Sequence, residues 1–222
     1  MKINDRLKRI GDLVDTNSLC LDIGCDHALL DIYLVKERKF SKAIGSDIKE
    51  GPLENARINI KKYQVQDKVE LRIGDGLEPY TDDIDTVLVS GMGGRTIIGI
   101  FKNNLRITKK LNQIIVSPNN YQMDVRKFFT SIGFYIEDEE LVKDGKYIYQ
   151  IMKIKKGKKH YSRKHMFFGP ILLTKKNKLF KDYYKRELTS RKIMIDLLPK
   201  NFYLKKLKIK KEINMIEREL EN

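Results

Sequence analysis

The sequence predicts an α/β fold in which a doubly wound, mostly parallel sheet is followed by a C-terminal helical hairpin. Short apolar runs alternate with helical patterns through residues 1–152, and this alternation is typical of a parallel sheet covered on both faces. From Leu172 onward, apolar residues recur instead at steps of three and four, as on one face of a helix. The 222 residues, 41% of them hydrophobic, suffice for one domain of ordinary size with an appendage.

The first helix is expected over Asn4–Val14, because Leu7, Ile10 and Leu13 fall on one helical face. Seven apolar runs after this helix are expected to form strands. In chain order, the runs are Cys20–Ile23, Lys42–Asp47, Val69–Ile73, Thr86–Ser90, Gln113–Ser117, Phe134–Leu141 and Lys146–Lys153.

Helical patterns are expected between the first five strands, for example over Leu53–Lys62 and Thr96–Asn104. A further helix over Asp124–Ser131 is expected to precede the last two strands. Asp144 and Gly145 separate those two strands, and this dipeptide is typical of a tight hairpin turn. Five βα units are therefore predicted to end in an antiparallel pair.

The pattern changes after Lys153. Residues 155–159 resemble a linker, and Phe167–Pro170 is typical of a turn. Two helical patterns follow, interrupted at Pro199–Asn201, and two helices joined by a short turn are expected to form an antiparallel coiled-coil hairpin. The alternative is two solvated helices packed flat on the main domain. The predicted domains are residues 1–154 and residues 155–222.

The net charge of +15 is unevenly distributed along the chain. Residues 1–152 contain 23 Lys and Arg against 23 Asp and Glu, so they are neutral overall. Residues 153–222 contain 22 Lys and Arg against 7 Asp and Glu, which accounts for the whole surplus of 15. A general bias toward lysine would charge both parts of the chain. The partition therefore predicts a catalytic body joined to an arm that binds a polyanion.

Several classes of protein are disfavoured by composition. Met1–Asp5 lacks the apolar centre of a signal peptide and no run of 18 apolar residues follows, so we expect a cytoplasmic protein with no membrane partner. Cys20 and Cys25 flank one turn and are expected to be free thiols. The three histidines have no cysteine partners at zinc spacing, so no metal site is expected.

Four predicted strands end in segments suited to ligand binding: Asp22–His27, Gly45–Ile48, Gly74–Gly76 and Gly91–Gly94. The carboxyl ends of parallel strands lie at one edge of a sheet, and open α/β sheets bind their ligands there. One glycine-rich turn is weak evidence, because many such turns are simple connectors. Four turns at the same edge predict a single binding site for a small ligand.

The acidic residues of these turns argue against a ligand with a pyrophosphate group. Asp22 and Asp26 would repel phosphate charges in the turn where the dinucleotide-binding pattern has glycines. A cofactor with a sulfonium and an ammonium but no phosphate suits them better, which predicts S-adenosylmethionine, with Asp47 on the ribose and Asp75 near the adenine. As alternatives, Asp22 could cap a helix and Asp75 could satisfy its own turn.

A family resemblance rests on four motifs at these strand ends: Asp22-Ile23-Gly24-Cys25-Asp26-His27-Ala28, Gly74-Asp75-Gly76, Gly91-Met92-Gly93-Gly94 and Pro118-Asn119. Together they resemble the bacterial tRNA (adenine-N1) methyltransferase family TrmK, whose members methylate the adenine at tRNA position 22. The resemblance extends over essentially the whole chain, because Phe168–Pro170 followed by a helical hairpin is also similar to that family. It implies a class I methyltransferase fold with a Rossmann-like sheet.

The resemblance also implies which residues bind S-adenosylmethionine. Gly24, Asp26 and His27 are expected at the methionine end. Those expected at the ribose and adenine are Asp47, Ile48, Asp75 and Gly76, and the other cofactor-binding residues expected are Asp22, Gly91 and Met92. Three residues depart from the family pattern: Cys25 stands in place of serine, Asp31 in place of a common proline, and Ser117 in place of glutamine.

Methylation at adenine N1 places modest demands on the protein, since N1 has a lone pair and needs no prior deprotonation. The main requirement is alignment of N1, methyl group and sulfur. Asp26 is expected to face the methyl group, Asn119 to hold the exocyclic amine, and Tyr121 to stack on the base. The alternative for Asn119 and Tyr121 is a structural role in the loop or the core. His27 is expected to orient the cofactor rather than act as a base.

The polymer substrate expected is tRNA, bound through the basic C-terminal arm, and a monomer is expected rather than an oligomer. Three other functions stay open at this point. They are a methyltransferase of another RNA base such as one in ribosomal RNA, a non-catalytic RNA-binding module on a cofactor-binding fold, and a nicotinamide-dependent dehydrogenase.

Overall fold

The computed structural model describes residues 1–16, 18–199 and 201–221, and its chain divides into two compact units, Met1–Thr174 and Lys175–Asn222. The boundary thus follows Thr174, whereas the sequence analysis placed it after residue 154. The difference arises because two short helices, α7 (Arg163–Phe168) and α8 (Pro170–Lys175), come between the sheet and the second unit. No helix in the described part of the chain combines the length and the apolar character needed to cross a membrane.

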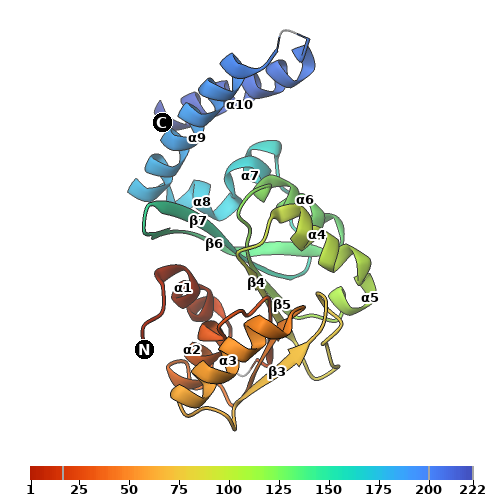
Figure 1. Ribbon diagram of the computed structural model, residues 1–222. Helices are drawn as coiled ribbons and strands as arrows, with labels where there is room; N and C mark the ends of the chain where they lie inside the picture. Colours follow the sequence, from red (N-terminus) through yellow and green to blue (C-terminus); the bar gives the residue numbers. More distant parts are fainter. Residues whose placement is uncertain (17, 200, 222) are drawn as a thin grey trace. The chain divides into compact units, whose positions relative to one another are not determined.

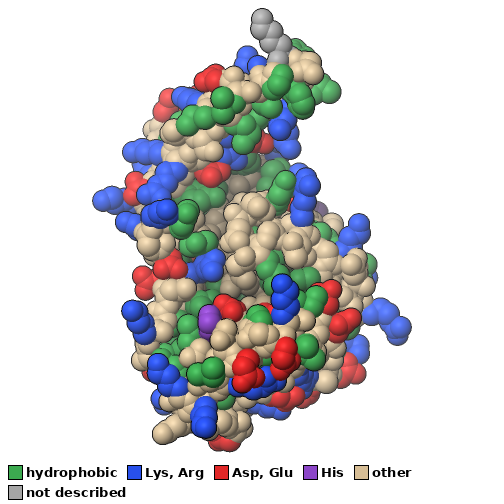
Figure 2. Space-filling view, in the orientation of Figure 1, with side chains coloured by type: hydrophobic (Ala, Val, Ile, Leu, Met, Phe, Trp, Pro, Cys, Tyr) green, Lys and Arg blue, Asp and Glu red, His purple; other side chains and the backbone are tan. Residues whose placement is uncertain are grey.

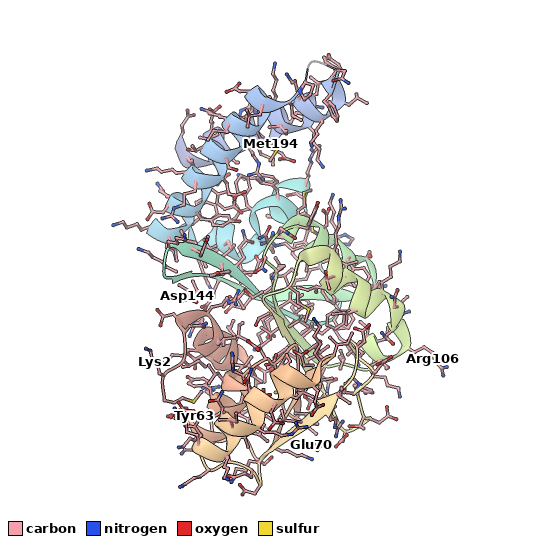
Figure 3. The ribbon with its side chains drawn as sticks, viewed as in Figure 1. Lys2, Tyr63, Glu70, Arg106, Asp144 and Met194 are labelled. Atoms are coloured by element: carbon pink, nitrogen blue, oxygen red, sulfur yellow. The ribbon has the colours of Figure 1, made fainter. Side chains whose placement is uncertain are left out.

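The first unit is built around one sheet with the strand order β3-β2-β1-β4-β5-β7-β6 (Figure 1). The strands are β1 (Cys20–Ile23), β2 (Ala43–Asp47), β3 (Val69–Ile73), β4 (Thr86–Ser90), β5 (Gln113–Ser117), β6 (Phe134–Asp144) and β7 (Tyr147–Lys156). The first five pair in parallel, and β7 runs antiparallel to both β5 and β6. The predicted doubly wound sheet with a final antiparallel pair is therefore confirmed. Both hairpin strands are longer than predicted, and β6 ends at Asp144, labelled in Figure 3.

Helices cover both faces of this sheet. They are α1 (Asp5–Leu13), α2 (Leu29–Lys36), α3 (Glu50–Lys62), α4 (Gly94–Asn103), α5 (Leu105–Thr108) and α6 (Gln122–Ser131). The sequence analysis expected a helix between each of the first five strands, but residues 74–85 between β3 and β4 form turns instead. Gly76 there adopts a φ of 54°, a left-handed conformation that does not continue into a helix.

The core is divided between the two faces of the sheet by the alternation of side chains along each strand. Cys20 and Leu88 belong to the cluster that includes apolar residues of α1, α2 and α3. Leu21 and Val87, their neighbours in β1 and β4, belong to the cluster that includes residues of α4 and α6. All four side chains are fully buried, so the strands are covered on both faces, as their continuous apolar sequences predict.

A buried ion pair joins α6 to the antiparallel hairpin. Arg126 of α6 donates from Nε to Oε1 of Glu139 on β6 at 2.5 Å, and both side chains are fully buried. The guanidinium also donates to Gln150 Oε1 on β7 at 2.6 Å and to the Met166 carbonyl of α7 at 3.2 Å. Glu139 Oε2 accepts from the Ile171 N–H of α8 at 3.1 Å. This network ties the last helices of the first unit to its sheet.

The second unit consists of two helices, α9 (Lys178–Leu197) and α10 (Tyr203–Glu221). They lie side by side as a helical hairpin (Figure 1), and Arg191 of α9 pairs with Glu212 of α10 at 3.0 Å. Both helices and the interruption between them were predicted. Within the interruption at Pro199–Asn201, Lys200 lies outside the described residues.

We expect Arg126→Met to destabilise the first unit strongly, because it leaves the buried Glu139 carboxylate without its cation. Breaking a buried pair in this way costs about 3–5 kcal/mol. The measurement is the urea midpoint of unfolding of the full chain, followed by circular dichroism. Arg57→Met is the control, since Arg57 pairs with Glu50 and Glu54 on the surface of α3, and its midpoint is expected to stay unchanged. An Arg126→Met midpoint equal to the wild type would show that the network is dispensable.

Candidate active site

The carboxyl ends of β1, β2 and β4 meet at one edge of the sheet, as predicted. Ile23, the last residue of β1, pairs with Ser46 of β2 on one side and with Val89 of β4 on the other. The loops that follow these strands are therefore neighbours. Their residues line a cavity of about 450 Å³.

The turn after β1 is fixed to β2 by its backbone. The N–H groups of Gly24 and Cys25 both donate to the Ser46 carbonyl, at 2.8 and 2.9 Å. Gly24 has a φ of 75°, and a Cβ at this position would lie 2.6 Å from Cε of Met92. The left-handed backbone favours glycine here, and a side chain would also displace the end of the Met92 side chain.

The turn ends in a helix without a side-chain cap. Asp26 and Ala28 adopt φ values of 48° and 51°, and α2 begins at Leu29 with no capping hydrogen bond to a side chain. Asp22 therefore does not cap α2, which removes one alternative considered for it. Leu29 and Leu30 line the cavity, so the first turn of α2 faces it with N–H groups that no side chain caps.

Three acidic residues line the cavity from different segments. Asp22 is 4% exposed, and burial together with the negative charges of Asp31 and Asp47 raises its pKa well above the ordinary range. Asp26 is exposed and lies 3.4 Å from His27, measured from Oδ2 to Nε2. Asp47 accepts a hydrogen bond from the Lys49 N–H at 3.1 Å. The cavity therefore favours a cationic ligand and disfavours phosphate.

The loop after β4 is held by the loop after β5. Gly91 has a φ of 78°, and its carbonyl accepts from the side-chain amide of Asn119 at 2.6 Å. The backbone N–H of Asn119 donates to the Met92 carbonyl at 2.9 Å. Asn119 therefore fixes the cavity wall formed by Gly91 and Met92.

Tyr121 stands at the start of α6 in a conformation unusual for a tyrosine. Its φ is 55°, its side chain is 42% exposed, and the Arg95 guanidinium lies 4.4 Å from the ring centroid. A strained backbone of this kind persists only where the surroundings hold it, as at many functional sites. The ring offers a flat, exposed surface next to a cation.

The structure gathers seven of the predicted site residues in the cavity: Asp22, Gly24, Asp26, His27, Asp47, Gly91 and Met92. Five others lie outside its lining: Ile48, Asp75, Gly76, Asn119 and Tyr121. Ile48 is 59% exposed. The turn at Asp75 is held by Glu78, whose Oε2 accepts from the Asp75 N–H at 2.8 Å and whose own N–H donates to the Asp75 carbonyl at 3.0 Å. The Gly74 N–H donates to the Asp47 carbonyl at 3.0 Å, which places this turn beside Asp47.

The sequence analysis missed the contribution of the N-terminal segment. Asn4, Arg6 and Leu7 line the cavity, although they precede β1 in the chain. Asn4 caps α1 by accepting from the Leu7 N–H at 2.8 Å, and the Arg6 guanidinium lies 4.2 Å from the centroid of the Tyr149 ring. Asn4 carries a capping signal in the sequence, but nothing local to Arg6 indicates that it reaches the cavity.

Comparison with known proteins identifies the family of this chain. The family model described as tRNA (adenine(22)-N(1))-methyltransferase, TrmK, matches residues 20–218. The tRNA (adenine(22)-N(1))-methyltransferase of Bacillus subtilis is 26% identical over 195 residues, which are 85% of this chain and 82% of that protein.

Solved structures of similar proteins have the same fold. Sp1610 of Streptococcus pneumoniae, in complex with S-adenosyl-L-methionine, has a TM-score of 0.90 at 26% identity, over 99% of this chain and 100% of the other. TrmK of M. capricolum, in complex with S-adenosyl-homocysteine, has a TM-score of 0.86 at 27% identity, over 100% and 99% of the two chains. The cavity at the strand ends, the family match over most of the sequence and the shared fold lead to one conclusion: the chain belongs to the TrmK family of S-adenosylmethionine-dependent tRNA (adenine(22)-N(1))-methyltransferases.

Proposed function

We propose that this chain transfers a methyl group from S-adenosylmethionine to N1 of adenine 22 in tRNA, using the cavity at the carboxyl ends of β1, β2 and β4. The observation that carries the proposal is the acidic, glycine-bounded cavity in a chain that matches the family over residues 20–218. A volume of about 450 Å³ suits a small cofactor. When bound, S-adenosylmethionine supplies a methyl group activated by a positively charged sulfur.

The residues of the cavity divide between the parts of the cofactor. Asp22, Asp26 and His27 are proposed for the methionine end, where the uncapped first turn of α2 offers N–H groups to the carboxylate. Gly24 leaves room for the backbone to approach, and Asp47 is proposed to accept from the ribose hydroxyls.

The adenine end is proposed to extend beyond the cavity lining to Ile48, Asp75 and Gly76. The hydrogen bond from the Gly74 N–H to the Asp47 carbonyl supports this extension, because it keeps the third turn next to the proposed ribose site. Asp75 is exposed, so its carboxylate can accept from an exocyclic amine.

The protein's part in the chemical step is alignment of the attacking nitrogen with the methyl group. Asp26 lies on the cavity rim and is proposed to face the reacting methyl. Asn119 holds Gly91 and Met92, and is proposed to contact the exocyclic amine of the target adenine from this position. Tyr121, with Arg95 beside it, is proposed to stack on the flipped base.

The second unit is proposed to bind the tRNA. Residues 175–222 contain 15 Lys and Arg against 7 Asp and Glu, and Figure 2 shows basic side chains along the hairpin. Folded RNA is bound largely through its shape and its phosphates, and a basic helical surface suits both. Lys181 and Lys185 are exposed on α9, one turn apart.

We expect the wild-type protein to add one methyl group per tRNA, at N1 of adenine 22. The measurement is mass spectrometry of nuclease fragments after incubation of tRNA with the protein and S-adenosylmethionine. A tRNA with guanine at position 22 is the matched control and is expected to gain nothing. Methylation of a different base, or of ribosomal RNA in preference to tRNA, would contradict the proposed target.

Asp47→Asn is expected to weaken S-adenosylmethionine binding by about 10- to 100-fold, the effect of losing charge-assisted hydrogen bonds of about 1.5–3 kcal/mol. Calorimetric titration measures the change. The control is Asp67→Asn, an exposed acidic residue in the turn between α3 and β3, which is expected to leave the affinity unchanged. An Asp47→Asn affinity equal to the wild type would remove Asp47 from the ribose site.

Lys181→Glu/Lys185→Glu is expected to lower tRNA affinity about tenfold or more at 0.1 M salt and to flatten its salt dependence, because two phosphate contacts are lost. S-adenosylmethionine affinity is expected to stay unchanged. The matched control is Lys61→Glu/Lys62→Glu, two exposed residues at the end of α3. Equal losses of tRNA affinity in both double variants would show a general charge effect and refute the assignment of the hairpin.

A further inference from the structure

Asp31 of α2 is a buried carboxylic acid that the proposed reaction does not use. Its exposed fraction is 0%, and neither side-chain oxygen has a hydrogen-bond partner in another described residue. A Cβ at Gly45 would lie 2.9 Å from Asp31 Oδ2 and 3.0 Å from Cys25 Sγ. The missing side chain of Gly45 on β2 therefore makes room for this carboxyl group.

Asp31 lies close to Asp22, the buried acid of the cavity. Gly45 pairs with Asp22 across β1 and β2, and paired residues of neighbouring strands direct their side chains to the same face of a sheet. Asp22 lines the cavity, whereas Asp31 does not contribute to its surface. Asp31 is therefore a second carboxyl group on the protein side of the cavity wall.

Burial controls the protonation of this pair. It raises the pKa of Asp31 to about 7, against the opposing effect of the residue's own N–H group. The pKa of Asp22 is raised well above its ordinary range, first by burial and then by the charge of Asp31. Near neutral pH the two groups hold a proton, and each loses it less readily while the other is charged.

The other titratable groups on the elements around Asp31 were considered as alternative sources of the released proton. Burial raises the pKa of the Cys20 and Cys25 thiols, so they stay protonated. On the neighbouring elements, Asp12 of α1 accepts from the Tyr33 hydroxyl at 2.7 Å. Glu70 of β3 pairs with Lys42 and Arg72. Asp47 and His27 line the cavity, so His27 needs a control of its own.

We propose that Asp31 is a positioning residue of the cofactor site: it carries a proton beside Asp22 in the free protein and releases that proton when a cationic cofactor binds. The inference rests on the proposed function, because it takes the ligand to be a sulfonium. The released proton goes to solvent, and the charged pair then attracts the sulfonium.

The same proton distinguishes cofactor from product. Methyl transfer breaks the bond from sulfur to the methyl carbon and forms one from that carbon to N1, so the positive charge passes to the base. The sulfur is left neutral, and the carboxyl pair takes one proton back from water. Because the pair has regained its proton, it attracts S-adenosylhomocysteine less strongly, and the protein binds this product with a higher Kd than S-adenosylmethionine.

The test is calorimetric titration of the full chain with S-adenosylmethionine in two buffers of different ionisation enthalpy, between pH 6 and pH 8. We expect the wild type to release about half a proton near pH 7 and a larger fraction at pH 6, and its Kd to fall about tenfold from pH 6 to pH 8. S-adenosylhomocysteine, without the sulfonium, is expected to release a smaller fraction. Asp31→Asn is expected to bind S-adenosylmethionine with no proton release and with a Kd constant within about twofold over this range.

Two further variants keep the outcome decisive. His27→Gln is expected to bind S-adenosylmethionine more weakly, because His27 belongs to the proposed cofactor site, but to release the same number of protons per molecule bound. Asp31→Ala, a second replacement in case the asparagine variant does not fold, is expected to lose the release. Proton release that persists in both folded Asp31 variants, or that disappears in His27→Gln alone, overturns the proposal. Absence of S-adenosylmethionine binding in the wild type would instead refute the proposed function.

Discussion

The parallel pairing of β1 with both β2 and β4 is the constraint on which the site depends. It brings three strand ends to one edge, so that the Ser46 carbonyl of β2 can accept the N–H groups of Gly24 and Cys25. The turn after β1 is thereby fixed on its neighbour rather than by its own side chains. The helix α2 begins after this turn without a side-chain cap, so the N–H groups of its first turn face the cavity. Sheet register, more than any single side chain, creates the ligand site.

Burying carboxylates at that edge is costly unless a cation or a proton compensates them. Asp22 is almost fully buried and has no cation beside it in the described structure, and the same holds for Asp31. Arg126 and Glu139 illustrate the opposite arrangement, in which a guanidinium compensates a fully buried carboxylate. The acids without a cation lie at the cavity, and the acid paired with a cation holds the framework. The contrast indicates that the cavity is built to receive positive charge from a ligand.

Much of the first unit could be predicted from sequence because its signals are local. The apolar runs and glycine turns placed the five parallel strands, and the Asp144-Gly145 turn placed the antiparallel hairpin. The sequence did not predict positions that depend on contacts between residues far apart in the chain. Arg6 reaches the cavity from a helix that precedes the sheet, and α7 and α8 join the first unit through the Arg126 network. Nothing local in the sequence indicates that Asp31 is buried beside Asp22. Its position follows from the pairing of Gly45 with Asp22 across β1 and β2.

A methyltransferase for RNA must satisfy two opposite electrostatic demands. Its cofactor is a cation that needs acidic surroundings, whereas its polymer substrate is a polyanion that needs basic ones. A single surface cannot meet both, since acids strong enough to hold a sulfonium would repel the phosphates. In this chain the basic surplus lies entirely in residues 153–222, and residues 1–152 are neutral, with acids gathered at the strand ends. Of the 22 basic residues in that segment, 7 at positions 153–174 belong to the first unit and 15 to the second. The partition of charge along the sequence therefore follows from the reaction itself.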